Sequence, residues 1–207
     1  MSGSWHVTEM ACARDQMALA EFDVIQDRLF HFSEDGAIGV FTPRPVAVPS
    51  VRSPAQEWLN GPLVWAVSET RQAAYLFPRD CPRVLVWPTP ETSEADLATW
   101  FGERDVTMIA HVERQWLERI QEQVLFRYEL PVDSFQAIED GWMWVSEESV
   151  TPIDVRRIDD LVGALETQGA ELRLMDDLVS LRDVWETTLH ASGIRLRNAK
   201  DWPSELT

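Results

Sequence analysis

The stretch Arg28-Leu29-Phe30-His31-Phe32-Ser33-Glu34-Asp35 sets the expected fold of this chain. Residues 29–32 form a short apolar run rich in aromatic side chains, which is typical of a β-strand. The run ends on a histidine, a serine and two acids. Pockets hold their ligands with a few such polar groups placed among apolar walls. We therefore expect a strand here, with His31 and Ser33 at the rim of a binding cleft.

The length and composition predict one globular domain. The chain has 207 residues, and 45% of them are hydrophobic, which is enough for a sizeable core. Residues 1–26 have a mixed pattern without a clean period, so we expect an N-terminal extension there. The single domain then covers residues 27–207.

The charge of the chain excludes some classes of partner. The formal net charge is −17, and a field of that sign repels phosphate backbones and anionic membranes. We therefore expect no duplex nucleic acid held by general electrostatics and no membrane partner. A small anionic ligand held by a few local arginines remains compatible with this charge. No run of 18 apolar residues occurs, and the expected location is the cytoplasm.

Cysteine usage argues against a disulfide framework or a zinc site. The two cysteines, Cys12 and Cys81, lie far apart in the sequence, and neither has a thiol or histidine at ligand spacing. We accordingly expect no metal.

Hydrophobic patterns predict alternating short strands and helices. Strands are expected at residues 29–32, 63–67, 83–87, 124–130, 142–146, 150–158 and 171–175. Helices are expected at residues 69–77, 93–100, 108–123, 160–167 and 178–190. The clearest helical periodicity is that of residues 108–123, where apolar residues recur at three- and four-residue spacing: Met108, Ile109, Val112, Trp116 and Ile120.

These elements indicate an α+β fold with a curved, mostly antiparallel sheet and flanking helices. The order lacks βαβ regularity, and no glycine-rich phosphate loop is present, so neither a Rossmann nor a P-loop site is supported. Residues 41–62 contain five prolines and form a long irregular stretch. This stretch is either a packed loop over a cleft or a surface connection.

Three motifs in sequence order carry a resemblance to a known superfamily. The motifs are Leu29-Phe30-His31-Phe32-Ser33, then Val64-Trp65-Ala66-Val67 with Ala73-Ala74-Tyr75, and finally residues 126–131 with Trp144-Val145-Ser146. Over residues 28–158 they resemble the ADP-ribosyltransferase superfamily. The whole chain, including Phe77-Pro78-Arg79-Asp80-Cys81-Pro82-Arg83, also resembles an uncharacterised bacterial family of unknown function.

The superfamily resemblance implies chemistry on NAD. It gives His31 contacts with the ribose hydroxyls or the nicotinamide amide, lets Ser33 add a hydroxyl, and makes Tyr75 the aromatic that supports the nicotinamide. The glutamate of the superfamily would fall at Met143, which is not an acid. Glu147, just after the Ser146 step, is then the candidate catalytic carboxylate beside His31. The resemblance thus implies an NAD or ADP-ribose nucleotide as ligand, and leaves conventional transferase activity in question.

Arginines supply the second set of candidate ligand contacts. Arg79 and Arg83 flank Pro82, and the tail carries Arg195, Arg197 and Asn198. If the tail is extended, Arg195 and Arg197 face the same way, and guanidinium groups suit diphosphate oxygens. His190 begins this tail and would join His31 if the tail folds back over the cleft.

Simpler interpretations exist for each of these residues. His31 would do no more than bond a backbone carbonyl, Ser33 would belong to a turn, and Tyr75 would be a core residue. The arginines would pair with the many carboxylates of the chain. On that basis the alternative function is a non-catalytic protein-interaction domain, with tryptophans and the proline-rich stretch as its binding surface.

Overall fold

The computed structural model describes residues 28–49, 51–138 and 142–203. Within these ranges the chain is α+β, and its strands form two sheets with mostly antiparallel pairing. This confirms the expected class and the antiparallel character, although the strands divide into two sheets where one was expected. The predicted extension over residues 1–26 lies outside the described residues, and the proposed domain boundary stays a prediction.

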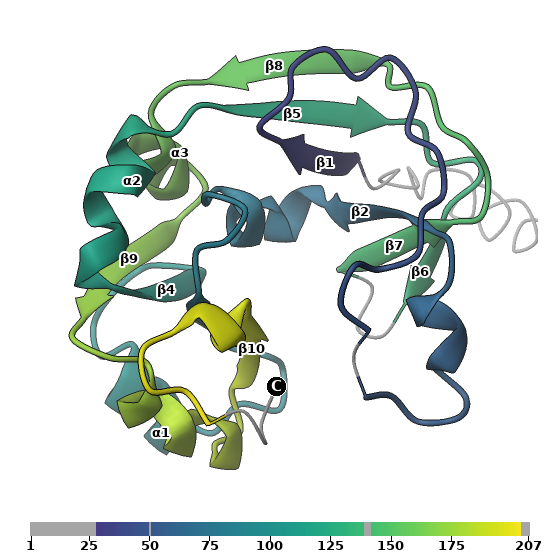
Figure 1. The fold of residues 1–207 in the computed structure, drawn as a ribbon. Helices are drawn as coiled ribbons and strands as arrows, with labels where there is room; N and C mark the ends of the chain where they lie inside the picture. The colour runs from purple at the N-terminus through teal and green to yellow at the C-terminus, as the bar shows by residue number, and fades with distance from the viewer. Residues whose placement is uncertain (1–27, 50, 139–141, 204–207) are drawn as a thin grey trace, which may run out of the picture.

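The larger sheet has six strands in the order β6-β7-β2-β1-β5-β8 and occupies the upper part of the molecule in Figure 1. All its pairs are antiparallel. Its strands are β1 (Leu29–Ser33), β2 (Val64–Ser68), β5 (Leu125–Leu130), β6 (Gln136–Ile138), β7 (Met143–Ser146) and β8 (Asp154–Ile158). The last of these lies at the sheet edge and begins just after Pro152, as expected for an extended segment that starts with proline.

The smaller sheet has four strands in the order β10-β3-β4-β9. Its strands are β3 (Arg83–Trp87), β4 (Met108–Glu113), β9 (Ala170–Met175) and β10 (His190–Ile194). The pair β4–β9 is parallel, and the other pairs are antiparallel. All five residues of β3 and all six of β4 are buried, which fits central strands covered on both faces.

Three short α-helices and several 3-10 helices connect the strands. The α-helices are α1 (Glu94–Trp100), α2 (Leu117–Glu122) and α3 (Leu161–Thr167). Ser93 caps α1 by accepting a hydrogen bond from the Asp96 N–H, and Asp160 caps α3 in the same way through Gly163. The 3-10 helices are Glu57–Asn60, Glu69–Tyr75, Arg114–Trp116, Val179–Glu186 and Leu196–Asn198.

Core clusters line both sheets, and two of them cover the two faces of the smaller sheet. One cluster packs β3 and β4 against α2 and α3, through Leu85, Met108, Ile120 and Leu161 among others. A second cluster covers the opposite face with the Val179–Glu186 helix, through residues such as Val84, Ile109, Leu181 and Val184. Figure 1 shows α2 and α3 on the left side of the molecule, beside the junction of the two sheets.

The helix predicted over residues 108–123 is wrong in its first half. Residues 108–113 are the strand β4, and α2 begins only at Leu117 after a 3-10 turn. The spacing of Met108, Ile109 and Val112 fits a helix, but the polar residues His111 and Glu113 of the same segment are also buried. A segment buried all round has no polar face, and a short apolar run of this kind does not separate a strand from a helix.

The C-terminal region also differs from its prediction. Residues 178–190 were expected to form one helix, but a 3-10 helix ends at Glu186 and β10 begins at His190. The extended tail expected over residues 192–199 ends at Ile194. Arg195 then adopts a left-handed backbone with φ of 56°, and a 3-10 turn follows. Arg195 and Arg197 therefore do not alternate along a strand as predicted.

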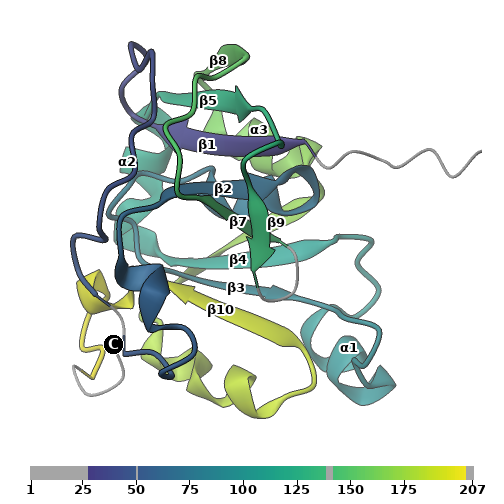
Figure 2. The same cartoon turned by 90° about the vertical axis from the view of Figure 1, so that its right-hand side faces the viewer.

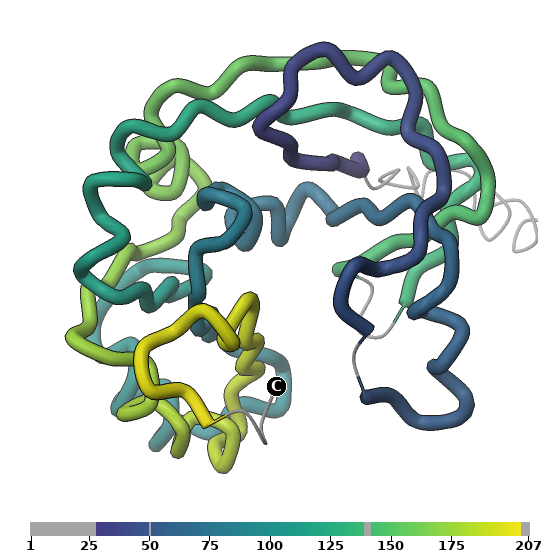
Figure 3. Tube along the Cα trace, in the orientation of Figure 1, coloured from purple at the N-terminus to yellow at the C-terminus, as the bar shows by residue number. Residues whose placement is uncertain are grey.

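Two irregular segments lie on the same side of the molecule. Figure 3 traces residues 34–62 from the end of β1, across the larger sheet and down the right of the view to β2. In Figure 2 the first part of this segment and the yellow C-terminal turn both lie on the left. Tyr128 fixes the start of the segment, because its hydroxyl donates to the Asp35 carbonyl at 2.8 Å and accepts from the Ile38 N–H at 3.1 Å.

Candidate functional site

Three segments that are distant in sequence meet beside the end of β1. The Arg79 N–H donates to the Glu34 carboxylate at 3.0 Å, which joins the end of β1 to the segment 77–82. Arg195 Nε donates to the Arg79 carbonyl at 3.3 Å, and Asn198 Nδ2 donates to the Asp80 carbonyl at 2.7 Å. The C-terminal turn is thus fastened to the same proline-bounded segment.

Five arginines, Arg44, Arg79, Arg83, Arg195 and Arg197, lie near this junction together with His31, and we call the six residues the arginine cluster. Charge interactions link its members in pairs. The charges of Arg79 and Arg44 act on His31, those of Arg79 and Arg197 act on Arg195, and that of Arg195 acts on Arg83. Arg79 thus interacts with both His31 and Arg195, and a shared site for His31 and the tail arginines stays a prediction.

His31 is held between β1 and β2 where their pairing ends. The ladder joins Leu29 to Ser68 and Phe30 to Val67, and the next side chain, His31, places Nδ1 2.8 Å from the Trp65 carbonyl oxygen. A carbonyl only accepts, so Nδ1 carries the proton and Nε2 of the neutral ring is an acceptor. The expectation that this histidine bonds a backbone carbonyl is correct for Nδ1, and it leaves Nε2 for a ligand.

The protonation state of His31 follows from its surroundings. Burial lowers the pKa of the half-buried ring below the usual value for histidine, the bond to Trp65 opposes this shift, and the charges of Arg79 and Arg44 lower the pKa further. The ring packs against Phe41 with a centroid distance of 4.7 Å. His31 is accordingly neutral at pH 7, with a fixed orientation.

Arg83 is a buried guanidinium whose hydrogen bonds go to carbonyl groups. Its residue surface is only 3% exposed, Nε donates to the Ala74 carbonyl and Nη1 to the Cys81 carbonyl, both at 2.9 Å. The rings of Phe77 and Tyr75 lie 4.9 and 5.7 Å from the guanidinium carbon. Burial lowers the pKa of Arg83 to about 10, and the Arg195 charge acts in the same direction.

None of the five arginines of the cluster forms an ion pair within the described ranges. The ion pairs there are made by other arginines: Arg28, Arg104, Arg114, Arg156, Arg157 and Arg173. For Arg195, burial lowers the pKa, Arg197 adds to the effect, and Asp80 partly offsets it. The interpretation that the arginines serve to pair with carboxylates is therefore wrong for Arg79, Arg195 and Arg197 among these residues.

The comparisons with known proteins were made on the whole chain. A family model matches residues 30–199. The chain belongs to DUF6886, a family of unknown function. No curated protein and no solved structure matches the chain. The expected membership of a family without an assigned function is thus confirmed, and the matched range contains the complete arginine cluster.

Tyr75 is a partly buried residue that packs against the apolar core. Burial raises the pKa of its phenol, and its hydroxyl donates to the Met143 sulfur at 3.4 Å. Met143 is the position where the superfamily resemblance would put a glutamate. The structure thus places a thioether opposite Tyr75 there, next to the apolar Phe30 and Val67.

Two predicted residues do not join the cluster through any contact in the described structure. Ser33 is 7% exposed, and its hydroxyl accepts a hydrogen bond from the Asp35 N–H at 3.1 Å, which makes it a turn residue as the simpler interpretation predicted. Glu147 is exposed in the turn after β7, beyond Ser146. Its catalytic role stays a prediction.

His190 lies away from His31. It is the first residue of β10 and pairs with Trp87, whereas the cluster lies beyond the other end of that strand, where Ile194 pairs with Arg83. Arg44 lies on the long irregular stretch, which was expected to be either a packed loop over a cleft or a surface connection, and it was not among the predicted site residues. Pro43 and Pro45 on either side of it restrict the backbone there.

The described residues contain neither a metal-binding group nor a membrane-spanning helix. No group of three or more histidine, cysteine, aspartate or glutamate residues there is arranged to hold a metal ion. No helix in that part of the chain combines the length and apolar character needed to cross a membrane.

Proposed function

We propose that the arginine cluster binds the diphosphate of an ADP-ribose nucleotide such as NAD, on a fold related to the ADP-ribosyltransferases. The observation that carries this proposal is that the buried Arg83 and the half-buried Arg195 form no ion pair within the described residues of a chain with net charge −17. The exposed Arg44, Arg79 and Arg197 form none there either. Buried charges are normally paired, because desolvation without a counter-charge is costly. A ligand anion supplies that counter-charge.

The geometry of the cluster suits a diphosphate better than a single carboxylate. Arg83 is buried and Arg195 is partly buried, so their bonds to an anion are screened less than those of surface arginines. A guanidinium presents two parallel N–H donors that match phosphate oxygens. Several such groups within electrostatic reach of one another accommodate the two negative charges of a diphosphate.

His31 adds recognition of a neutral polar group. Its Nε2 is an acceptor on a ring held by the Trp65 carbonyl, and it suits a donor such as a ribose hydroxyl or a carboxamide N–H. This contact corresponds to the one that the superfamily resemblance implies.

The proposal concerns binding first, and catalysis only in addition. Transfer of ADP-ribose requires a carboxylate beside the forming oxocarbenium centre, and Glu147 is the candidate, because Met143 occupies the usual position.

Ligand-dependent thermal stability tests the proposal. ADP-ribose and NAD should raise the melting temperature in a concentration-dependent manner, and adenosine, which lacks the diphosphate, should not. Arg195→Met should weaken ADP-ribose binding about tenfold or more in calorimetry, because a hydrogen bond to a charged group is lost. Arg156→Met is the matched control, since Arg156 is paired with Asp154 on the exposed edge strand β8.

The outcome separates binding from catalysis. If neither ADP-ribose nor NAD shifts the melting temperature at millimolar concentration, or if both arginine variants behave alike, the proposed site is wrong. If the shift is present, release of nicotinamide from NAD by the wild type but not by Glu147→Gln identifies an enzyme. Binding without release identifies a nucleotide-binding protein.

Exposed apolar residues on the proline-rich stretch favour a second candidate function, a protein-interaction surface. Val51 is 98% exposed, Val48 52% and Trp58 42%, and the three lie on residues 41–62. Exposed apolar side chains that gather on one segment mark interaction sites. The net charge of −17 favours a partner protein with a positively charged surface. Under this alternative, nucleotides leave the melting temperature unchanged, and Val51→Ser with Trp58→Ser weakens binding of a basic partner protein.

A further inference from the structure

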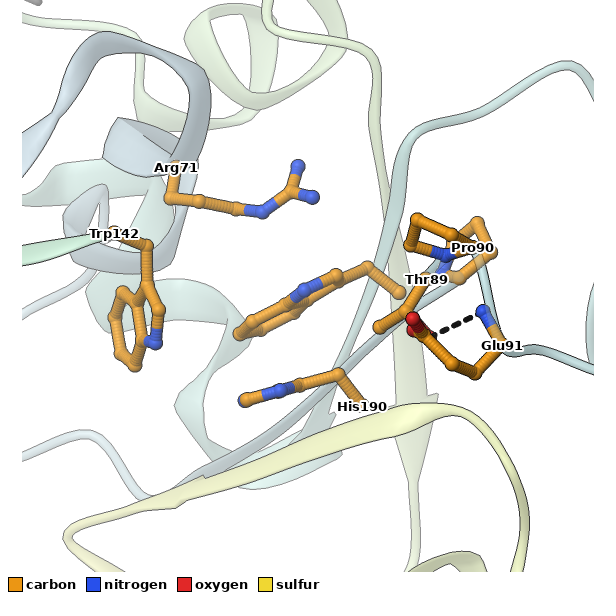
Figure 4. Close-up of a pocket in the computed structure, with 8 residues that line it drawn as sticks. Arg71, Thr89, Pro90, Glu91, Trp142 and His190 are labelled. Atoms are coloured by element: carbon orange, nitrogen blue, oxygen red, sulfur yellow. Dashed lines mark hydrogen bonds between the residues drawn. The ribbon is translucent and has the colours of Figure 1, made fainter. Parts of the chain in front are cut away.

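A separate cavity lies at the opposite end of β3 and β10 from the arginine cluster. Its volume is about 260 Å³. The strands pair Ile194 with Arg83 at the cluster end and His190 with Trp87 at the cavity end. The cavity is lined by Arg71, Trp87, Pro88, Thr89, Pro90, Glu91, Trp142 and His190, which Figure 4 draws.

Three aromatic side chains form one part of its wall. The His190 imidazole stacks on the Trp87 indole, with centroids 4.1 Å apart and planes 14° from parallel. Trp142 meets both rings edge-on, at centroid distances of 5.5 Å to Trp87 and 6.3 Å to His190. The Trp142 indole nitrogen is buried with no hydrogen-bond partner in the described residues. With two prolines beside them, these flat surfaces suit a flat apolar group.

Arg71 supplies the positive charge of the cavity. Its guanidinium carbon lies 5.1 Å from the centroid of the Trp87 ring. Its one recorded hydrogen bond is a long one of 3.4 Å to the carbonyl of the preceding residue, Thr70. It forms no ion pair within the described ranges. Burial lowers the pKa of Arg71, so this cation is partly desolvated without a counter-charge.

The acid at the cavity does not neutralise Arg71. Glu91 is exposed, and its backbone N–H is bonded to the Thr89 hydroxyl. Figure 4 shows Glu91 beside Pro90, on the opposite side of the cavity from Trp142. An exposed carboxylate is screened by solvent, whereas the half-buried guanidinium is screened less.

We infer that this cavity binds a small aromatic carboxylate, with the ring among Trp87, Trp142 and His190 and the carboxylate on Arg71. The size supports a single-ring compound, because cavities for drug-sized ligands start at about 300 Å³. The site is independent of the proposed nucleotide site, since the two lie at opposite ends of the same strand pair.

Benzoate and benzamide form a matched pair of probes, because they share one ring and differ in charge. Benzoate should shift the indole N–H resonance of Trp142, assigned by its loss in Trp142→Phe, and should bind about tenfold or more tighter than benzamide. Arg71→Met should remove that preference, and Glu91→Gln should leave it unchanged or increase it. Arg114→Met, which alters an exposed arginine elsewhere, is the control.

Several results would overturn the inference. These are equal binding of benzoate and benzamide, no resonance shift at millimolar benzoate, tighter binding of benzylamine than of benzoate, or weaker benzoate binding in Glu91→Gln. If Arg71→Met does not fold, the wild-type comparison of benzoate, benzamide and benzylamine still decides. Arg195→Met distinguishes the two sites: it should weaken ADP-ribose binding and leave benzoate binding intact. Loss of benzoate binding in that variant would place the probe in the arginine cluster.

Discussion

Acidification should destabilise the fold through His111, a buried histidine in the centre of the smaller sheet. His111 is 2% exposed, and its Nδ1 lies 3.3 Å from the Val84 carbonyl on β3. Burial lowers its pKa to about 4, and the Arg173 charge on β9 adds to this, whereas the Val84 bond and Glu171 oppose it. The folded state therefore keeps the ring neutral.

The sign and size of the effect follow from linkage. The unfolded chain has a histidine pKa of about 6.5, so between about pH 4 and 6.5 the unfolded state binds more protons than the folded state. The stabilisation that comes from His111 is thus fully present above about pH 6.5 and is lost as the pH falls toward about 4. The His111 contribution to the free energy of unfolding should drop by about 2 kcal/mol between about pH 7.5 and 5, and by about 3 kcal/mol at about pH 4.

Urea denaturation of the wild type and of His111→Gln across this pH range measures the contribution. The carboxylates titrate in both proteins, so the difference between their unfolding free energies isolates His111. The unfolding free energy of the wild type should fall by about 2 kcal/mol more than that of His111→Gln as the pH falls to about 5. A difference that stays flat would refute the reasoning. If His111→Gln does not fold, the ring resonances of His111 in the wild type should remain those of neutral imidazole down to about pH 5.

Three further predictions concern other parts of the fold. Cys81 should resist alkylation by iodoacetamide in the folded protein, measured by mass spectrometry in a Cys12→Ser background, because the thiol is buried and its pKa is raised to about 12. Tyr128→Phe should cost about 1–3 kcal/mol in denaturant unfolding, since two backbone groups of the segment after β1 lose their partner. Gly36→Ala should cost about 1–3 kcal/mol, because the new Cβ would lie 2.5 Å from the Phe126 ring, whereas Gly39→Ala meets nothing within 4 Å and should be nearly neutral.

Local patterns located most of the strands correctly. The apolar runs at residues 29–32, 83–87 and 142–146 all became strands, and the Ser93 cap and the Asp160 cap mark the starts of α1 and α3. These signals are local, because proline, capping residues and apolar runs act on their own few residues. The sequence could not separate strand from helix at residues 108–113, where burial on both faces removed the polar face that would have decided.

The candidate site was predicted in its residue types and only partly in its geometry. His31, Arg79 and Arg195 were expected to share a cleft; the charge of Arg79 acts on both other residues, and the shared cleft stays a prediction. Arg195 is a left-handed residue followed by a 3-10 turn, where an extended tail was expected. Ser33 and Tyr75 were each predicted with a simpler alternative, and their contacts agree with it: a turn for Ser33 and core packing for Tyr75.

The sequence by itself determined the α+β class and the first strand, which contains His31. The tertiary structure decided which distant residues became neighbours. Arg195 meets the Arg79 carbonyl across 116 residues, and His190 stacks on Trp87 at the far end of the same strand. A local pattern states which side chains avoid water and with what period. Which residues pack against those side chains depends on tertiary packing of the whole chain. That packing determines which arginines become neighbours.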